Sequence, residues 1–291
     1  MTFQRAYIPY KGYYCSPFSK WQGSFANQNS IVLGAETAKR WLASKGWEAS
    51  MFDYTYHGMT QPQNQSFYGS TWAGTMMGSQ VPGVTIMQAC STSTTCINLA
   101  ALAVDAGTQV TPFCFLADRM SNGPHLIWPN PNGPGGEVVS ENWFMDNVNC
   151  DPATGAGMLV TAENVARKAG ATREQADELA VRRYEQYQDA LKDDRAFQKR
   201  YMFPVEVKLS RKKSIIIEAD EGITPVTREG CAKLRPVAPD GIHTFASQTH
   251  PADGNAGIIV TTKSRALELS PDPTKAIQVI SYGFARVEKS H

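Results

Sequence analysis

The sequence predicts an α/β fold with a partly parallel sheet. Strand-like and helical segments alternate along most of the chain, and residues 83–116 read as strand, helix and strand, the order of a βαβ unit. The chain has 291 residues, of which 42% are apolar, so it can bury a large core in one or two compact units.

The individual elements follow from local patterns. Helices are expected where apolar residues recur at three- and four-residue spacing, and strands where short runs are apolar or alternate with polar residues. Gly46, Gly107 and Gly170 follow three of the helices as stops, and Thr172 with Gln175 has the spacing of a capping box. In chain order we expect a helix at 35–45, a buried strand at 83–88, a helix at 92–106, a strand at 109–116, a helix at 161–168, a helix after Thr172 with an apolar stripe of Ala176, Leu179, Ala180, Tyr184, Tyr187 and Leu191, strands at 203–209, 213–219 and 256–262, a short helix at 264–269 and a strand at 276–282.

Residues 118–157 break this alternation. Proline, glycine and asparagine dominate the segment, which is far longer than an ordinary connection. It also contains Trp128, Trp143 and Phe144, which disordered linkers rarely carry. We therefore expect an ordered excursion that lies over a binding site or a subunit interface.

Composition excludes several classes of protein. The net charge of +1 lacks the basic surplus of a nucleic-acid-binding protein. No apolar run approaches the roughly 20 residues of a membrane helix, and residues 1–5 contain no apolar signal core, so we expect a soluble, cytoplasmic protein. The 6 cysteines form no Cys-x-x-Cys pair, and there is no His-Glu-x-x-His. We expect neither a metal site nor a disulfide framework.

Cys90 is the best candidate for chemistry. It follows a predicted strand and precedes the helix that begins near Thr92. At a helix N-terminus, unpaired N–H groups and the positive end of the helix dipole favour the thiolate over the thiol. The same N–H groups can stabilise a developing oxyanion. The alternative is a buried thiol at a strand end, and spacing alone does not choose between the two.

Three other polar residues are weaker candidates. His57, before Gly58, is interpreted as a structural histidine rather than a ligand or base. Asp253, beside Gly254, is interpreted as a turn or cap carboxylate. For His250, in the same predicted turn, a structural and a functional role remain equally open.

The segment Gln88-Ala89-Cys90-Ser91-Thr92-Ser93, after an apolar strand and before an alanine-rich helix, resembles the nucleophile segment of thiolases. Further segments resemble the same family in the correct order and cover nearly the whole chain. They are residues 17–24, 116–121, 161–166, 219–221 with 231–236, and 252–256.

The resemblance implies a thiolase fold, a layered αβα arrangement with a mixed sheet. It implies an N-terminal core of residues 1–117 and 244–269, an inserted CoA-binding loop domain of residues 118–243, and the start of a C-terminal domain at 270–291. The implied activity is acyl transfer. A 3-oxoacyl-CoA would be cleaved by a second coenzyme A, or formed by the reverse Claisen condensation, through an acyl-cysteine.

The resemblance also implies roles for particular residues. Cys90 would be the nucleophile, and Met158, Leu234, Ser247 and His250 would contact coenzyme A. Ser247 is small and polar, which suits a hydrogen bond to the amide of the pantetheine arm. Coenzyme A would be a substrate, with no cofactor and no metal.

Several departures from the family pattern accompany the resemblance. The usual Cys-Ala/Gly-Ser-Gly is Cys-Ser-Thr-Ser at residues 90–93, and a basic residue that often assists CoA binding is replaced in the run 222–225. The Asn-Glu-Ala-Phe, Gly-His-Pro and Cys-x-Gly-Gly segments of the family's second half are absent from these 291 residues. We expect that this chain alone lacks part of the active site, because the sequence is truncated or because another chain completes the fold.

Further expectations concern substrate and assembly. Trp72, Trp128, Trp143 and Phe144 suggest a bulky or aromatic acyl group, unless these rings pack the loop domain or a dimer contact. A homodimer or larger assembly is expected, and some thiolases pair with a small zinc-ribbon and OB-fold protein. The alternative functions are a ketoacyl synthase-like condensing enzyme and a non-catalytic thiolase-fold subunit.

Overall fold

The computed structural model describes residues 2–288, and the chain forms two compact units. Unit 1 consists of the residues up to Asn122 together with Lys199–Gly222 and Pro251–Phe284. Unit 2 consists of Gly123–Gln198, Ile223–His250 and the residues after Phe284. The core and loop-domain boundaries implied by the family resemblance stay a prediction.

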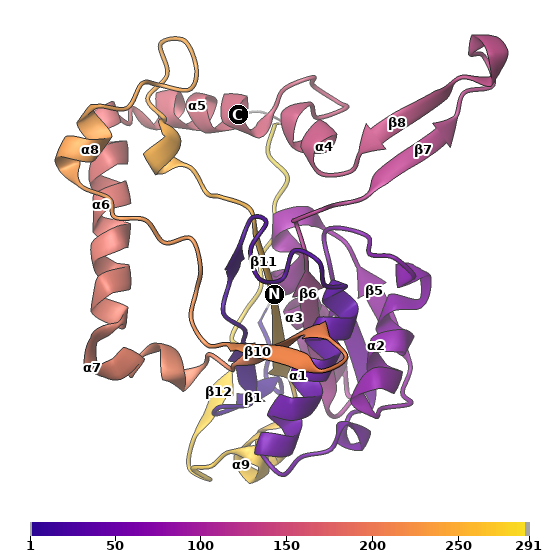
Figure 1. The fold of residues 1–291 in the computed structure, drawn as a ribbon. Helices are drawn as coiled ribbons and strands as arrows, with labels where there is room; N and C mark the ends of the chain where they lie inside the picture. Colours follow the sequence, from indigo (N-terminus) through magenta and orange to yellow (C-terminus); the bar gives the residue numbers. More distant parts are fainter. Residues whose placement is uncertain (1, 289–291) are drawn as a thin grey trace. The chain divides into compact units, whose positions relative to one another are not determined.

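Unit 1 is built on a mixed six-stranded sheet (Figure 1). Its strand order is β2 (Tyr13–Cys15), β11 (Ala252–Ile259), β6 (Pro112–Asp118), β4 (Tyr54–Gly58) and β5 (Gly83–Ile86), with β3 (Ser19–Lys20) also paired to β11. β5, β4 and β6 run parallel, whereas β11 is antiparallel to β6 and to β2. The partly parallel sheet expected from the sequence is confirmed.

Helices cover both faces of this sheet. Phe113 and Phe115 of β6 belong to one buried cluster with residues of α1 (Ser30–Ser44) and α2 (Gly69–Met77). Cys114, between them in sequence, belongs to a second cluster with residues of α3 (Thr92–Ala106). Because successive side chains of a strand point to opposite faces, α1 and α2 lie on one side of the sheet and α3 on the other.

One predicted helix has the expected boundaries, and another begins earlier than expected. α3 spans the expected residues and ends at Gly107, whose φ of 74° is readily adopted only by glycine. α1 instead begins five residues before the expected start. The Asn29 side chain accepts hydrogen bonds from the N–H groups of Ile31 (3.0 Å) and Val32 (3.3 Å), so it caps the helix there.

β5 differs from its expectation. It ends at Ile86, and Val84 is 37% exposed, because β5 is an edge strand with a partner on one side alone. The expectation of a buried strand was therefore wrong. The strands expected at 203–209 and 213–219 are present as β9 (Val205–Ser210) and β10 (Lys213–Ile217), which pair as an antiparallel hairpin. α9 (Lys263–Leu269) lies where expected, and β12 (Ala276–Gln278) pairs antiparallel with β1 (Tyr7–Pro9).

Unit 2 combines helices with one two-stranded ribbon (Figure 1). β7 and β8 form this ribbon within the proline-rich excursion, which is therefore ordered. The elements of unit 2 are β7 (His125–Pro129), β8 (Val138–Asn142), α4 (Met145–Asn149), α5 (Met158–Ala169), α6 (Arg173–Ala190), α7 (Lys192–Arg195) and α8 (Arg228–Ala232). Short 3₁₀ turns complete the two units at Ala49–Met51, Ser66–Tyr68, Ala89–Ser91, Pro134–Gly136, Gln198–Arg200 and Phe245–Ser247.

α6 begins as the sequence predicts. The Thr172 side chain accepts from the N–H of Gln175, and the Gln175 side chain accepts from the N–H of Thr172, which completes the capping box. The expected apolar stripe is partly wrong, because Leu179 is 53% exposed and Val181 is the residue that α6 buries. Within residues 2–288 no helix has both the length and the apolar character needed to cross a membrane.

Candidate active site

Cys90 lies between β5 and α3, as the sequence predicts. It is the middle residue of the 3₁₀ turn Ala89–Ser91, and it is an exposed free thiol. Ser91 occupies the N-cap position of α3, but its hydroxyl donates to the carbonyl of Gln88 (2.9 Å) and caps no N–H group. The Ser91 side chain therefore accepts no hydrogen bond from the N–H groups at the start of α3, where the N–H of Thr92 donates to the carbonyl of Ala89. The helix N-terminus also carries the positive end of the helix dipole, which favours an anion there.

The residue before Cys90 has an unusual backbone. Ala89 adopts a φ of 45°, in the left-handed region. For a residue with a Cβ atom this conformation costs about 1–2 kcal/mol relative to the right-handed one. Such strain persists only where surrounding contacts enforce it, and it concentrates at functional sites. No sequence pattern indicates this conformation, because alanine does not favour the left-handed region.

His57 is part of the core. Its side chain is fully buried in β4, Nδ1 lies 3.4 Å from Oγ1 of Thr85, and the ring lies 5.2 Å from that of Phe115. Nε2 has no partner among the described residues. Burial lowers the pKa of His57 from its ordinary value of 6.5 to about 4, so the ring is neutral at pH 7. These contacts agree with the interpretation of a structural histidine.

Two carboxylates hold loops that follow strands of the sheet: the buried Asp253 holds the loop after β6, and the half-buried Asp118 holds the loop after β4. Asp253 accepts hydrogen bonds from the N–H groups of Met120 (2.7 Å) and Ser121 (2.9 Å). Asp118 accepts from the N–H groups of Thr60 (2.8 Å) and Gln61 (3.1 Å), and burial raises its pKa. Asp253 is thus structural, as interpreted, but it lies within β11 and not in a turn.

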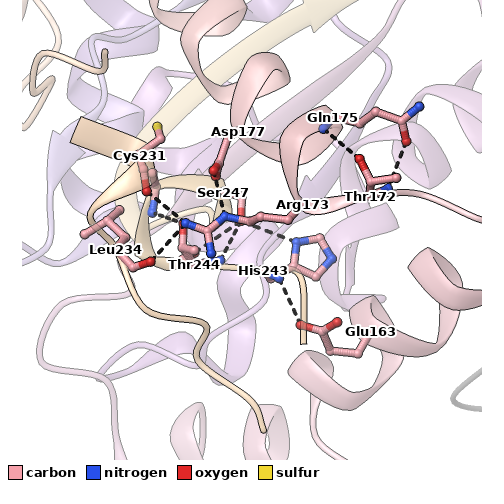
Figure 2. Close-up of polar contacts among 11 residues, drawn as sticks. Glu163, Thr172, Arg173, Gln175, Asp177, Cys231, Leu234, His243, Thr244 and Ser247 are labelled. Atoms are coloured by element: carbon pink, nitrogen blue, oxygen red, sulfur yellow. Dashed lines mark hydrogen bonds and ion pairs between the residues drawn. The ribbon is translucent and has the colours of Figure 1, made fainter. Parts of the chain in front are cut away.

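In unit 2, Glu163 holds a loop in place (Figure 2). The carboxylate of this α5 residue is 9% exposed and accepts from the N–H groups of Ile242 (3.0 Å) and His243 (3.1 Å). A Cβ atom on Gly241 would lie 2.5 Å from Oε1 of Glu163, so a side chain at this position would displace the carboxylate from its present place. The resemblance marked the segment around Glu163, but it did not reveal this partner.

Arg173 binds backbone carbonyls at the end of α8, whereas Glu163 binds backbone N–H groups (Figure 2). Its guanidinium donates to the carbonyls of Cys231 (2.8 Å) and Leu234 (2.9 Å), and its Nε donates to Asp177 (2.6 Å). The planar group therefore fixes the backbone that carries Leu234, one of the predicted CoA-binding residues. Leu234 itself is half-buried.

The Ser247 hydroxyl is already engaged within its own turn (Figure 2). It accepts from the N–H of Thr244 (2.9 Å), donates to the Thr244 carbonyl (3.2 Å) and lies 3.4 Å from Nδ1 of His243. The Thr244 side chain in turn accepts from the N–H of Ala246 (3.2 Å). Sequence reasoning missed this capping box, although its Thr-x-x-Ser spacing was visible.

The remaining predicted residues are exposed. The ring of His250 lies 4.6 Å from the ring of Phe245 and is tilted by 44° against it, and Met158 is 59% exposed as the first residue of α5. Met158, Leu234, Ser247 and His250 all belong to unit 2, whereas Cys90 belongs to unit 1.

Two cavities of unit 1 are lined by none of the predicted site residues. A groove of about 530 Å³ is lined by α1, Met76 and β9, and the Lys208–Glu36 ion pair (2.8 Å) lies within it. A cavity of about 10 Å³ lies between Phe25, Arg119 and Asn255. Across the described residues, no three His, Cys, Asp or Glu side chains are grouped as metal ligands.

Comparison with known proteins identifies relatives of this chain. The family model for the thiolase N-terminal domain matches residues 13–264. The acetyl-CoA acetyltransferase of Allochromatium vinosum is 27% identical over 279 residues, covering 94% of this chain and 70% of the relative. The 3-ketoacyl-CoA thiolase of Bacillus subtilis is 27% identical over 278 residues, covering 90% of this chain and 67% of the relative.

Solved structures agree on the fold. The crystal structure of Bacillus anthracis acetyl-CoA acetyltransferase superposes with a TM-score of 0.81 at 22% identity, over 92% of this chain and 68% of that one. Human mitochondrial 3-ketoacyl-CoA thiolase superposes with a TM-score of 0.80 at 23% identity, over 91% of this chain and 67% of that one.

The chain combines a layered mixed sheet with an exposed cysteine where a helix begins. Together with the relatives named above, these features define the class of protein as an α/β acyltransferase. The chain belongs to the thiolase family, as the family model over residues 13–264 establishes. It spans about two thirds of the length of the relatives compared above.

Proposed function

We propose that Cys90 is the nucleophile of a thiolase reaction on acyl-CoA. The observation that carries the proposal is the exposed Cys90 thiol in the turn that precedes the uncapped first turn of α3. The thiolate attacks the 3-oxo carbon of a 3-oxoacyl-CoA, and the bond between C2 and C3 breaks. The acyl group remains on Cys90 as a thioester, and the shortened CoA ester leaves after its C2 carbanion takes up a proton.

A second coenzyme A completes the cycle in this proposal. Its thiol attacks the Cys90 thioester, takes the acyl group and restores the cysteine; the reverse sequence is a Claisen condensation. Met158, Leu234, Ser247 and His250 contact coenzyme A. The proposal needs no metal and no organic cofactor, since both half-reactions are acyl transfers between thiols and carbon.

The test is acylation of the protein by acetoacetyl-CoA, followed by mass spectrometry of the peptides. We expect one acetyl group on the peptide with Cys90, and none in Cys90→Ser, because a hydroxyl does not ionise as a thiol does. Cys150→Ser is the matched control, because Cys150 is also an exposed free thiol. Acylation that persists in Cys90→Ser would disprove the assignment, and an unmodified wild-type protein would favour a non-catalytic subunit.

A finer proposal concerns the acyl group. A bulky or aromatic acyl chain is supported by the rings of Trp128, Trp143 and Phe144, of which Trp128 is 49% exposed. Trp72 gives no such support, because it packs against the α1 and α2 core. Acylation rates with acetoacetyl-CoA and with an aromatic 3-oxoacyl-CoA decide the point, and a clear preference for acetoacetyl-CoA would refute the aromatic assignment.

Assembly and location are also proposals. We propose a homodimer or larger assembly, supported by the unpaired edge of β5 and by the exposed Val84 (37%) and Met87 (42%) next to it. Sedimentation of the wild type and of Val84→Asp tests the assembly.

We propose a cytoplasmic location; one relative from Gibberella zeae is named cytosolic and one from Aspergillus fumigatus mitochondrial. A small zinc-ribbon and OB-fold partner stays a prediction for copurification to test.

A further inference from the structure

The turn that carries Cys90 is held by one buried hydroxyl. Oγ1 of Thr92 accepts a hydrogen bond from the N–H of Gln88 (2.8 Å) and donates one to the carbonyl of Ala89 (2.7 Å). Thr92 is 5% exposed, although Gln88, Ala89 and Cys90 around it are exposed. One side chain therefore joins the peptide group that precedes Gln88 to the peptide group that follows Ala89.

These two bonds act on the strained residue. The N–H of Gln88 and the carbonyl of Ala89 lie on either side of the rotations that give Ala89 its φ of 45°. A hydroxyl that bonds both groups selects the conformation in which they converge. Without it, Ala89 would relax toward the right-handed or extended regions that a residue with a Cβ atom prefers.

Thr92 is itself fixed from the other side. A Cβ atom on Gly58, at the end of β4, would lie 2.9 Å from the Thr92 methyl carbon, so Thr92 fills the space that this glycine leaves open. The Thr95 hydroxyl donates to Oε1 of Gln88 (2.6 Å), which ties the start of the turn to the second turn of α3. The Thr92 hydroxyl is thus positioned by the sheet, not by solvent.

We propose that Thr92 is a positioning residue for the Cys90 nucleophile: its hydroxyl keeps Ala89 left-handed and so holds Cys90 at the N-terminus of α3. The proposal rests on the assignment of Cys90 as the acylated residue. Threonine combines the two requirements, a hydroxyl for the turn and a methyl group for the contact with Gly58. Neither valine nor serine supplies both.

The variants separate these requirements. Thr92→Val keeps the shape and removes the hydroxyl, Thr92→Ser keeps the hydroxyl and removes the methyl group, and Thr92→Ala covers the case in which valine does not fold. Thr94→Val is the matched control, because the exposed Thr94 hydroxyl donates to the carbonyl of Ser91 (2.9 Å) and takes no part in holding Ala89.

The first measurement is the rate of Cys90 acylation by acetoacetyl-CoA. We expect Thr92→Val to lower this rate by about 10- to 100-fold, the scale on which small misplacements of a reacting group act. Thr92→Ser should stay within about 3-fold of the wild type, and Thr94→Val within about 2-fold. A rate for Thr92→Val within about 3-fold of the wild type would overturn the proposal.

The second measurement tests the strain directly. Glycine adopts left-handed backbone without a steric cost, so Ala89→Gly should make the hydroxyl less necessary. In the Ala89→Gly background we expect Thr92→Val to lower the acylation rate by less than about 3-fold. Two independent structural defects would instead lower the rate by the product of their separate effects. An equal loss in both backgrounds would show that Thr92 acts by some route other than Ala89.

The third measurement does not depend on acyl-CoA. The rate of iodoacetamide alkylation of Cys90 is measured at one pH in the same variants. We expect Thr92→Val to slow alkylation by about 3-fold or more, because the turn no longer presents the thiol at the start of α3, and Thr92→Ser to keep the wild-type rate. If the wild type is alkylated but never acylated, the proposed function fails while this comparison still decides the role of Thr92. An unchanged alkylation rate in Thr92→Val would refute that role.

Discussion

The buried carboxylate of Asp253 accepts a hydrogen bond from the backbone N–H of Met120 (2.7 Å), 133 positions earlier in the chain. The same oxygen also accepts from the N–H of Ser121 (2.9 Å). One carboxylate oxygen of Asp253, in β11, therefore accepts from two N–H groups of the loop that follows β6 and joins the loop to the strand.

This contact predicts a graded loss of stability. Asp253→Ala leaves two buried N–H groups without their acceptor and should reduce the free energy of unfolding by about 3 kcal/mol, whereas Asp253→Asn keeps a neutral acceptor and should cost about 1 kcal/mol. Urea unfolding followed by tryptophan fluorescence measures both. Asp240→Asn, at an exposed position, is the control; equal losses for the two Asp253 variants would contradict the prediction.

His57 predicts a pH dependence of stability. Its pKa is lowered from 6.5 to about 4 in the folded chain, so as pH falls below 6.5 the unfolded chain takes up a proton that the folded chain does not. Stability is therefore lost between pH 6.5 and about 4, and the loss from this group approaches about 3 kcal/mol before it levels off.

The comparison of variants isolates this group from the titrating carboxylates. The free energy of unfolding at pH 7 minus that at pH 4.5 should be smaller in His57→Gln than in the wild type. His125→Gln, at an exposed histidine, should keep the wild-type difference. A His57→Gln variant with the full wild-type difference would assign the pH dependence elsewhere.

Arg173 predicts a local effect near Leu234. Arg173 uses Nε for Asp177 and a second nitrogen for the carbonyls of Cys231 and Leu234. Arg173→Lys replaces this planar group by a single ammonium nitrogen, so it should destabilise this segment by about 1–2 kcal/mol. Amide hydrogen exchange should accelerate at residues 231–234. Arg183→Lys, on an exposed arginine of the same helix, should leave exchange there unchanged. Unaltered exchange in Arg173→Lys would mean that its hydrogen bonds do not hold the loop.

Ser247 predicts a binding effect that depends on the proposed function. Ser247→Trp should raise the acetoacetyl-CoA concentration for half-maximal acylation by about 10-fold or more, because the ring obstructs the path of the pantetheine arm. Alkylation of Cys90 by iodoacetamide should not change. Ser247→Ala controls for the lost capping hydroxyl, which alone should cost about 1 kcal/mol of stability. Unchanged CoA-ester dependence in Ser247→Trp would remove Ser247 from the CoA path.

Local signals in the sequence were sufficient for much of this fold. α3 with its Gly107 stop, the capping box of Thr172 and Gln175, and the place of Cys90 between a strand and a helix all follow from residues a few positions apart. Helix periodicity and caps depend on backbone geometry that neighbours in sequence determine. The segments that resemble the thiolase family are likewise short runs of consecutive residues, so the sequence alone was enough to identify them and their order.

Contacts between distant residues were decided by tertiary structure alone. Spacing did not indicate that β5 is an edge strand, that Asp253 binds the loop after β6, or that Glu163 binds the backbone of residues 242–243. The left-handed Ala89 is the clearest case, because alanine disfavours that conformation and a hydroxyl anchored against Gly58 of the sheet holds it there. The sequence by itself determined the strand–helix–strand order of residues 83–116 and the candidate nucleophile, but it did not predict β4, α2 or the ribbon of β7 and β8. Only the packing of distant segments decided the backbone conformation that presents the nucleophile, since strain in one residue is stable only when contacts from elsewhere in the fold offset it.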